Sequence, residues 1–176
     1  MSNIVDDEME MMSNDDSKAL KEELDSEVFS RPLEKIGPKP ATTLNVNQSI
    51  MAGVKLMQEK KIGSILVTEG GKLVGIVTER DILLKVVGTD CDLQAEISSI
   101  MTKSPISLQK SDKLAYVLNN MHVGGYRHVP VVDENEVPTG IISVKDVIQY
   151  ILDFFPKSVA NLCDQPYRGV TSRDGG

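Results

Sequence analysis

Apolar residues follow two alternating patterns along this chain. Short continuous apolar runs at 64–68 and 129–132, "SILVT" and "VPVV", are typical of strands buried on both faces. The stretches 43–57 and 107–121 open with a short β-like pair, pass through polar residues and continue with apolar residues at helical spacing. The turn formers "EGGK" and "DENE" follow the two apolar runs and predict tight connections between strands. The pattern predicts a chain of short strands and helices.

The same order of elements occurs twice. Residues 63–87 align with residues 127–151 at an offset of 64, which becomes 65 after one extra residue near Glu136. Each unit is predicted as strand, helix, strand, turn, strand and helix. A unit this small cannot bury its apolar face alone, whereas two copies packed together can. The predicted fold class is α/β in the α+β sense, with two tandem β-α-β-β-α repeats packed as a pair.

Segments of different composition flank and join the two units. Residues 1–16 are polar and acidic, and the spacing of Leu20, Leu24 and Val28 predicts a short amphipathic helix after them. The proline-rich stretch "RPLEKIGPKP" predicts an extended connector, and we expect "RPLEKI" to open the first unit as "AEISSIM" opens the second. The predicted division is an acidic arm at 1–29, a first domain at 30–90, a second domain at 91–155 and a tail at 156–176.

The net charge of −7 is concentrated in the N-terminal arm. Residues 1–30 carry ten acidic and two basic side chains, a net charge of −8, which leaves +1 for the remaining residues. An acidic arm repels phosphates, so the charge argues against a nucleic-acid partner. No apolar run is long enough to span a membrane, and Cys91 and Cys163 fit neither a disulfide framework nor a metal site. We expect a cytoplasmic protein without a signal peptide.

A seven-residue pattern recurs near the end of each unit, as "GIVTERD" and "GIISVKD". Its first three residues end a predicted strand, and Thr78 or Ser143 stands where that strand turns into a helix. Ser and Thr are good N-caps, and Asp81 or Asp146 three residues later completes a capping box. A purely structural explanation is therefore available, in which two helix caps were duplicated with the unit.

The same geometry also suits a nucleotide. A helix N-terminus offers unpaired N–H groups and a partial positive charge to an anion. A hydroxyl at that point can bond a phosphate or sugar oxygen, and a carboxylate one turn later can accept from both hydroxyls of a ribose. The two interpretations are compatible, because Thr78 can cap a helix and still face a ligand.

Both copies resemble CBS domains, the small regulatory modules named after cystathionine β-synthase. The matching residues are "IGSILVTEGGKLVGIVTERDIL" and "YRHVPVVDENEVPTGIISVKDVI", and the resemblance covers roughly residues 30–155. It implies a pseudo-twofold pair whose small sheets pack together and leave two clefts between the copies. It further implies that the clefts bind adenine nucleotides or S-adenosylmethionine and that the module dimerises.

The resemblance also assigns residues to each cleft. It implies that the motif Asp holds the ribose hydroxyls, that the motif Thr or Ser lies near ribose or phosphate, and that the base lies against the first strand and the start of the second. For the first cleft these residues are Thr42, Ile62, Gly63, Ser64, Ile65, Thr78 and Asp81. For the second cleft they are Ser104, Pro105, Ile106, Tyr126, Arg127, His128, Val129, Pro130, Ser143 and Asp146.

The two clefts are not expected to be equal. The second copy has Arg127 and His128 where the first has Gly63 and Ser64, and Arg and His can pair with phosphate. We therefore expect the second cleft to take the more highly charged ligand or to bind it more tightly. A surface ion pair for Arg127 and a half-buried, hydrogen-bonded His128 are the structural alternatives.

Three further side chains have two interpretations each. Arg80 and Lys145, inside the motifs, could reach phosphates or could be exposed helix charges. Tyr126 could stack on a base or serve only in packing.

The sequence does not indicate an enzyme. His122 and His128 are not at metal-ligand spacing, and neither a nucleophile elbow nor a P-loop occurs. We therefore expect no required cofactor, with AMP, ADP, ATP or S-adenosylmethionine as a regulatory ligand. The leading hypothesis is a homodimeric sensor that binds the nucleotide and signals to an unidentified effector protein. The alternative is a ligand-free dimeric interaction module in which the motif residues only cap helices.

Overall fold

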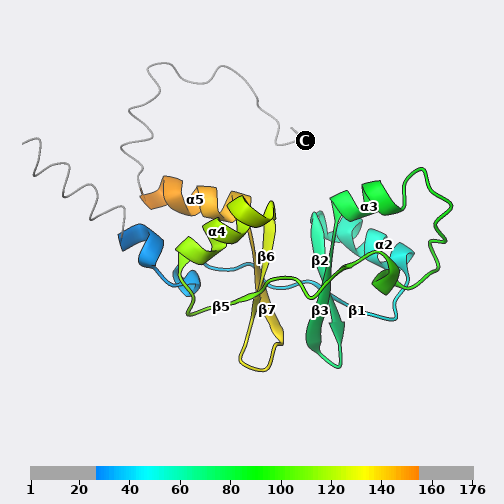
Figure 1. Cartoon of the computed structure of the whole chain (residues 1–176), viewed down its shortest axis with the longest axis horizontal. Coiled ribbons are helices and arrows are strands. Elements are labelled where there is room, and N and C mark those ends of the chain that lie inside the picture. Colours follow the sequence, from blue (N-terminus) through cyan, green and yellow to red (C-terminus); the bar gives the residue numbers. More distant parts are fainter. Residues whose placement is uncertain (1–26, 155–176) are drawn as a thin grey trace, which may run out of the picture.

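The structure is a computed structural model that describes residues 27–154. Two lobes of similar architecture lie side by side, one for each sequence copy (Figure 1). The predicted mixed fold and the order of elements are confirmed in both copies. The first copy contains β1 (Thr43–Asn45), α2 (Ile50–Lys60), β2 (Ser64–Glu69), β3 (Lys72–Thr78) and α3 (Glu79–Lys85). The second copy contains β5 (Leu108–Gln109), α4 (Leu114–Gly124), β6 (His128–Val132), β7 (Pro138–Ser143) and α5 (Val144–Phe154).

Each lobe has a small mixed sheet built around the apolar run predicted as a buried strand. The strand orders are β1-β2-β3-β4 and β5-β6-β7, where β4 is the short strand Thr102–Lys103. The first strand of each copy runs parallel to the buried strand, and its hairpin partner runs antiparallel to it. Thr78 lies opposite Ser64 in one hairpin, and Ser143 lies opposite His128 in the other. The two motifs therefore occupy the same register position in their sheets.

The helices between the first two strands of each copy end on local signals, and α2 also begins on one. The Ser49 side chain caps α2 by accepting from the backbone N–H of Ala52 at 3.1 Å. The helix α2 ends where Lys61 adopts a left-handed backbone with φ 51°, and α4 ends at the equivalent Gly125 with φ 66°. The second ending costs less strain because glycine has no Cβ. Both left-handed residues turn the chain out of the helix and toward the buried strand that follows.

The segments that precede the two copies cross between the lobes. The Lys39 N–H donates to Ile141 O at 3.0 Å, and the Ile141 N–H donates to Lys39 O at 2.9 Å. In the other lobe β4 pairs with β3 and places Thr102 opposite Ile76. Each connecting segment thus lines the edge of one sheet before it enters the other copy, which Figure 1 shows as two crossings between the lobes.

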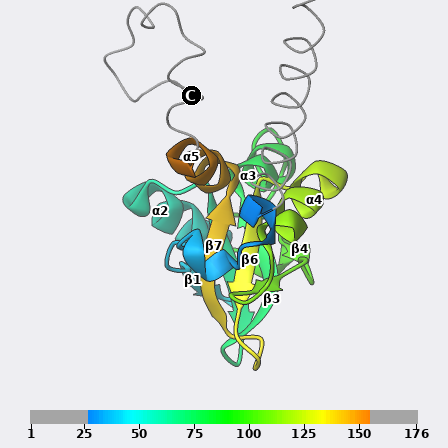
Figure 2. The same cartoon turned by 90° about the vertical axis from the view of Figure 1, so that its left-hand side faces the viewer.

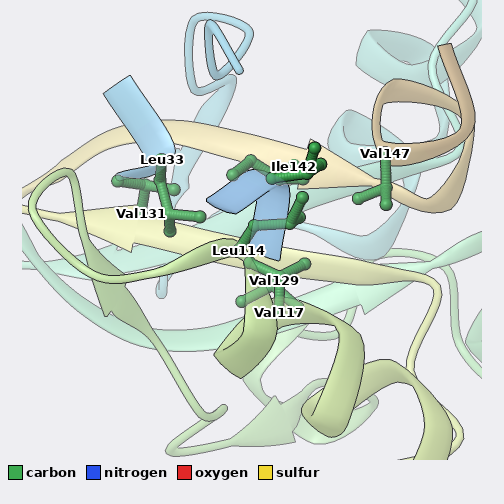
Figure 3. Close-up of a cluster of buried hydrophobic side chains, with 8 residues drawn as sticks. Leu33, Leu114, Val117, Val129, Val131, Ile142 and Val147 are labelled. Atoms are coloured by element: carbon green, nitrogen blue, oxygen red, sulfur yellow. The ribbon is translucent and has the colours of Figure 1, made fainter. Parts of the chain in front are cut away.

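The hydrophobic core of the second lobe includes residues that precede the first copy. Val28 and Leu33 are fully buried in it. Their partners, shown in Figure 3, are Leu114, Val117, Val129, Val131, Ile142 and Val147. The core of the first lobe takes Ile97 and Ile100 from the segment before the second copy.

The short segments before each copy are therefore exchanged. The stretch "RPLEKI" contains the 3-10 turn η1 (Leu33–Lys35), and "AEISSIM" contains the 3-10 turn η2 (Ile97–Ser99). We expected each stretch to open the unit that follows it, and this is wrong for their packing. Each turn packs in the core of the other copy, so the two lobes depend on each other for burial.

The two hairpins also meet at their tips. Leu73 donates its backbone N–H to Glu136 O at 3.0 Å, and Lys72 Nζ lies 3.1 Å from Glu136 Oε2. Figure 2 shows the tips at one end of the molecule and α3, α4 and α5 toward the other. The exposed ion pair contributes little stability. The backbone hydrogen bond from Leu73 to Glu136 joins the tips of the two hairpins.

Most of the predicted arm and the whole predicted tail lie outside the described residues. Residues 27–29 of the arm are described and are helical. Cys163 also lies outside, and Cys91 is a partly buried free thiol. Within residues 27–154, no helix combines the length and the apolar character that a membrane crossing needs.

Candidate functional site

A cavity of about 320 Å³ lies between the two copies. This volume falls within the range of small-molecule sites, roughly 300–1,000 Å³. Its wall comes from the end of β3 with the start of α3, from the segment around β4, and from the segment between α4 and β6. Of the residues predicted for a site, the cavity brings together Thr78, Arg80, Asp81, Ser104, Pro105, Ile106, Tyr126, Arg127 and His128.

The cavity combines the motif of the first copy with the segments assigned to the second. We expected Thr78 and Asp81 to share a cleft with residues 62–65, and Arg127 and His128 to face the second motif. This grouping is wrong, because the connecting segments cross between the lobes. The structure places the basic pair in the cavity wall together with the first motif.

Asp81 uses both of its carboxylate oxygens. Its Oδ2 accepts from the Thr78 N–H at 2.9 Å and from the Thr78 hydroxyl at 2.7 Å. The Asp81 N–H donates in return to Thr78 Oγ1 at 3.3 Å, so the predicted capping box is confirmed. Its Oδ1 accepts from Lys85 Nζ at 2.7 Å, and Lys85 also donates to Ile100 O at 2.6 Å. The cap thus consumes Oδ2 and leaves Oδ1 with a single donor.

The second motif makes the same cap with a different lysine. Asp146 Oδ2 accepts from the Ser143 N–H at 2.8 Å and from the Ser143 hydroxyl at 2.6 Å. Its N–H donates to Ser143 Oγ at 3.4 Å. Its Oδ1 lies 2.6 Å from Nζ of Lys39, which belongs to a crossing segment and not to the helix of Asp146. Ser143 and Asp146 do not line the cavity that holds the first motif.

Both motif carboxyls are ionised at neutral pH. Burial opposes ionisation of Asp81, but hydrogen bonds from Lys85 and Thr78 outweigh it and hold the pKa of Asp81 below its ordinary value. Burial likewise opposes ionisation of Asp146, and Lys39 and Ser143 lower its pKa in the same way. Each motif therefore carries a full negative charge.

His128 lies half-buried in the cavity wall at the start of β6. Burial lowers its pKa, and the neighbouring Arg127 lowers it further, although Glu79 and Asp146 act in the opposite direction. The ring is therefore neutral at pH 7. A neutral imidazole offers one hydrogen-bond donor and one acceptor. The ring is therefore suited to hydrogen bonding with a polar ligand atom and not to pairing with a charged one.

Three predicted site residues lie in the protein interior. Ile65 and Val129 belong to the two hydrophobic cores and have relative exposures of 0% and 1%. Pro130 is buried in the middle of β6. These side chains offer no surface to a base, so a role as contact residues stays a prediction without support from their side chains. Strands β2 and β6 are buried on both faces at these positions, so neither face presents a side chain to a ligand there.

The remaining first-copy residues lie apart from this cavity. Thr42 accepts a hydrogen bond of 3.5 Å from a lysine of α2, and Ser64 is nearly fully buried. Gly63 lies against the Glu79 side chain. Ile62 contributes to a separate, mainly apolar hollow between α2 and α3. Their role in a second cleft stays a prediction.

Five lining residues were missed, namely Ile76, Thr102, Lys103, Gly124 and Gly125. The edge strand β4 is too short to show any periodicity, so its two residues were counted with the linker. The paired glycines at the end of α4 stand directly before Tyr126 and the basic pair. A double glycine next to candidate phosphate ligands was a usable signal for backbone close to a ligand.

The lining combines a cationic part, one carboxylate and an apolar part. The side chains with nitrogen are those of Arg80, Lys103, Arg127 and His128, and the carboxylate is that of Asp81. Ile106 and Tyr126 add apolar surface that is 51% and 43% exposed. A ligand with a flat apolar ring, a diol and an anionic group would match all three parts. Among the described residues, no group of His, Cys, Asp and Glu could hold a metal ion.

Comparison with known families places the CBS domain twice on this chain, at residues 33–88 and 97–153. The CBS domain-containing protein YhcV of Bacillus subtilis is 31% identical over 105 residues, which covers 60% of this chain and 74% of that protein. An uncharacterized 17.7 kDa protein of Acidianus ambivalens is 32% identical over 108 residues, covering 61% of this chain and 65% of that protein. The match to protein MJ1232 of Methanocaldococcus jannaschii, at 28% identity, covers 70% of this chain and 40% of that protein. The chain thus spans less than two thirds of some of its relatives.

Solved structures of CBS domain pairs have the same fold. The CBS domain pair of protein MJ0100, in complex with 5′-methylthioadenosine and S-adenosyl-L-methionine, gives a TM-score of 0.62 at 28% identity and covers 69% of this chain and 95% of that chain. The CBS domain protein PAE2072 from Pyrobaculum aerophilum, complexed with AMP, gives a TM-score of 0.64 at 23% identity and covers 70% of this chain and 98% of that chain. The second likeness supports the fold alone.

Proposed function

This chain belongs to the CBS domain family, and we propose that it is a regulatory module that binds an adenine nucleotide between its two copies and signals to a partner protein. One observation carries the proposal: the cavity joins Thr78 and Asp81 of the first copy to Arg127 and His128 of the second. A ligand held there would contact both copies at once. Its binding would therefore depend on how the copies are placed relative to each other.

The ribose of the ligand is proposed to bind at Asp81. The carboxylate is ionised, and its Oδ1 has only Lys85 as a donor. A diol can donate two hydrogen bonds to a carboxylate, and hydrogen bonds to a charged acceptor are the stronger kind. The Thr78 hydroxyl donates its one hydrogen to Asp81, and it can still accept a hydrogen bond from a sugar hydroxyl while it caps α3.

The phosphates of the ligand are proposed to bind to Arg80 and Arg127. Among residues 27–154, neither guanidinium is engaged in an ion pair, so the surface ion pair considered for Arg127 is not formed. An arginine fork matches phosphate oxygens in bidentate geometry. Lys103 adds a third positive charge to the same wall. The cleft with the first motif, and not the second, is therefore the proposed site for the more highly charged ligand.

The adenine ring is proposed to lie against Ile106 and Tyr126. Both side chains line the cavity and keep a large exposed apolar surface. Covering such surface with an aromatic ring removes it from water. The MJ0100 domain pair, whose complex contains two adenosyl compounds, supports this class of ligand for the fold at 28% identity.

The signal is proposed to arise from the relative position of the two lobes. A ligand that contacts both lobes stabilises whichever arrangement gives it the better contacts, and it can shift the equilibrium only by that difference. Exposed apolar side chains on α3 and α5 offer a surface for a second copy of the chain or for an effector protein. They are Leu83, Leu84, Ile148 and Leu152.

Thermal unfolding with AMP, ADP, ATP and S-adenosylmethionine, each at millimolar concentration, tests the proposed function. A ligand at 100 times its Kd stabilises the fold by about 2.7 kcal/mol, which raises the Tm of a chain of this size by several degrees. Arg127→Ala should abolish the shift because it removes a phosphate contact. Lys145→Ala, in the motif outside the cavity, should keep it. The absence of a shift with all four compounds would overturn the proposed function.

A second candidate is a ligand-free dimeric interaction module. Both capping boxes are complete without a ligand, and the apolar side chains on α3 and α5 are exposed. Light scattering combined with the ligand series separates the two functions. A stable dimer that no adenine compound stabilises would favour the interaction module.

A further inference from the structure

We propose that Lys39 blocks the second cleft, so that each chain binds one nucleotide and not two. The inference rests on the proposed function, because it concerns the ligand count of the same module. It follows from a difference between the two copies at one structurally equivalent position.

The equivalent of Lys39 in the other lobe is Thr102. Lys39 pairs with Ile141 on β7, and Thr102 pairs with Ile76 on β3, where Ile76 and Ile141 are the same position of the repeated motif. The motif glycines confirm the alignment. A Cβ on Gly140 would lie 3.1 Å from Lys39 O, and a Cβ on Gly75 would lie 3.2 Å from Thr102 O.

Thr102 lines the cavity that holds Asp81. A residue at the equivalent position of the other lobe is therefore placed to line the second cleft beside Asp146. A threonine there is too short to fill the space next to the motif carboxylate, whereas a lysine is long enough to reach it.

Lys39 does reach the second motif. Its Nζ lies 2.6 Å from Asp146 Oδ1, while Oδ2 already accepts from the Ser143 N–H and hydroxyl. The side chains of Asp146 and Asp81 are almost equally exposed, at 13% and 14%, so the difference between the two copies lies in where each lysine comes from. Lys39 belongs to the segment at the position where Thr102 lines the first cleft, and its ammonium group occupies the oxygen that a ribose diol would need.

Lys85 does not block Asp81 in the same way. It stands four residues after Asp81 on the same helix, and its Nζ is also held by Ile100 O at 2.6 Å. Lys85 does not line the cavity, whereas Asp81 does. Lys85 therefore pairs with Asp81 from outside the residues that line the cavity.

The second cleft also lacks basic side chains that would bind a phosphate and so compensate for the displacement of Lys39. At the positions of Arg127 and His128 the first copy has Gly63 and Ser64, which carry no charge. Thr42, directly before β1, already accepts a hydrogen bond of 3.5 Å from Lys60. A phosphate in the second cleft would therefore form few favourable contacts. The ligand would also have to break the ion pair between Lys39 and Asp146.

Isothermal titration calorimetry with AMP, and separately with ATP, counts the sites per chain. We expect one site in the unmodified chain and two in Lys39→Thr, which gives the second cleft the residue of the first. Lys39→Arg keeps a cation beside Asp146 and should keep one site. The reciprocal Thr102→Lys places a cation beside Asp81 and should remove the single site, with its Tm showing that the chain remains folded.

The outcomes separate the two proposals. One site in both Lys39→Thr and the unmodified chain, or two sites in the unmodified chain, would overturn the block by Lys39 and leave the proposed function standing. No binding of either nucleotide to the unmodified chain or to Lys39→Thr would overturn the proposed function and the block together.

Discussion

Asp81 and Asp146 form a matched pair at the scale of single residues. Each accepts from the hydroxyl and the N–H of the residue three positions earlier, and each has a lysine at its other oxygen. They differ in surroundings, because only Asp81 lines the cavity with Arg127 and His128. Comparison of the two residues can therefore distinguish a capping role from a binding role within one molecule.

Substitution of each motif aspartate by alanine should affect stability alike and binding differently. Loss of a capping side chain costs about 0.5–2 kcal/mol, so Asp81→Ala and Asp146→Ala should both lower the free energy of unfolding by this amount. Only Asp81→Ala should lose nucleotide affinity. Urea unfolding and ATP titration of both variants test this, and normal ATP binding by Asp81→Ala would refute the assignment of the ribose site.

His128 should make the fold less stable as the pH falls from 7.5 to 5.5. Its pKa in the folded chain lies below the ordinary value of 6.5 because of burial and Arg127. In this window the unfolded chain binds more protons, so the free energy of unfolding decreases as the pH drops. The motif aspartates do not contribute here, because their pKa values lie below the ordinary 3.8.

Replacement of His128 by glutamine should flatten this dependence. Urea unfolding of the unmodified chain and of His128→Gln at both pH values measures the difference. An equally steep loss of stability in the variant would show that another group is responsible.

The sequence predicts the caps but not the grouping of the site residues. A capping box is local, because Thr78 and Asp81 are three residues apart and the pattern is visible in the chain. Whether Asp81 shares a cavity with Arg127 depends on how the connecting segments cross between the lobes. A cavity that joins the first motif to residues 62–65 and one that joins it to Arg127 are compatible with the same hydrophobic pattern, so only the three-dimensional structure distinguishes them.

At the scale of elements, the motif glycine is explained by the strand that crosses beside it. A Cβ on Gly140 would lie 2.8 Å from Pro38 Cβ and 3.1 Å from Lys39 O. A Cβ on Gly75 would meet the side chain of Met101. The glycine at the head of each repeated pattern therefore admits the connecting segment to the sheet edge.

Gly140→Ala should be more damaging than Gly75→Ala. Both glycines face a backbone oxygen at a similar distance, so the difference is that the Pro38 ring cannot move aside, whereas the Met101 side chain can adopt another rotamer. Overpacking of this kind costs about 1–3 kcal/mol, and we expect Gly140→Ala in this range and Gly75→Ala below it. Urea midpoints of the two variants decide the order, and a larger loss in Gly75→Ala would contradict the explanation.

The strands and helices that carry periodicity were predictable, and the shortest elements were not. The runs that became β2 and β6 show continuous apolar character, and the turns between the hairpin strands contain recognisable turn formers. The two-residue strand β4 and the 3-10 turns η1 and η2 are too short for any period. Their positions are decided by long-range packing.

At the scale of the whole molecule, the two copies form one folding unit with exchanged segments. Leu33 precedes β1 of the first copy and is buried in the core of the second lobe (Figure 3). Ile97 precedes β5 of the second copy and is buried in the core of the first lobe. Neither lobe has a complete core without the segment from the other side. A single copy cut from the chain is therefore not expected to fold stably.

Leu33→Ala should destabilise the chain although Leu33 lies before β1, the first strand of the first copy. A fully buried leucine replaced by alanine costs about 2–5 kcal/mol, and Leu33 has 0% exposure. Leu84→Ala on the exposed surface of α3 is the control and should change stability little. Urea unfolding compares the two, and a loss for Leu33→Ala as small as that for Leu84→Ala would contradict the shared core.

The most direct test of the central claim is an NMR titration of the ¹⁵N-labelled chain with ATP. The central claim is that one nucleotide binds between the two copies and contacts both of them. The account predicts that amide signals of residues 78–81, 102–106 and 124–128 shift together, with one dissociation constant. Shifts confined to one copy, or shifts centred on Ser143 and Asp146, would contradict it.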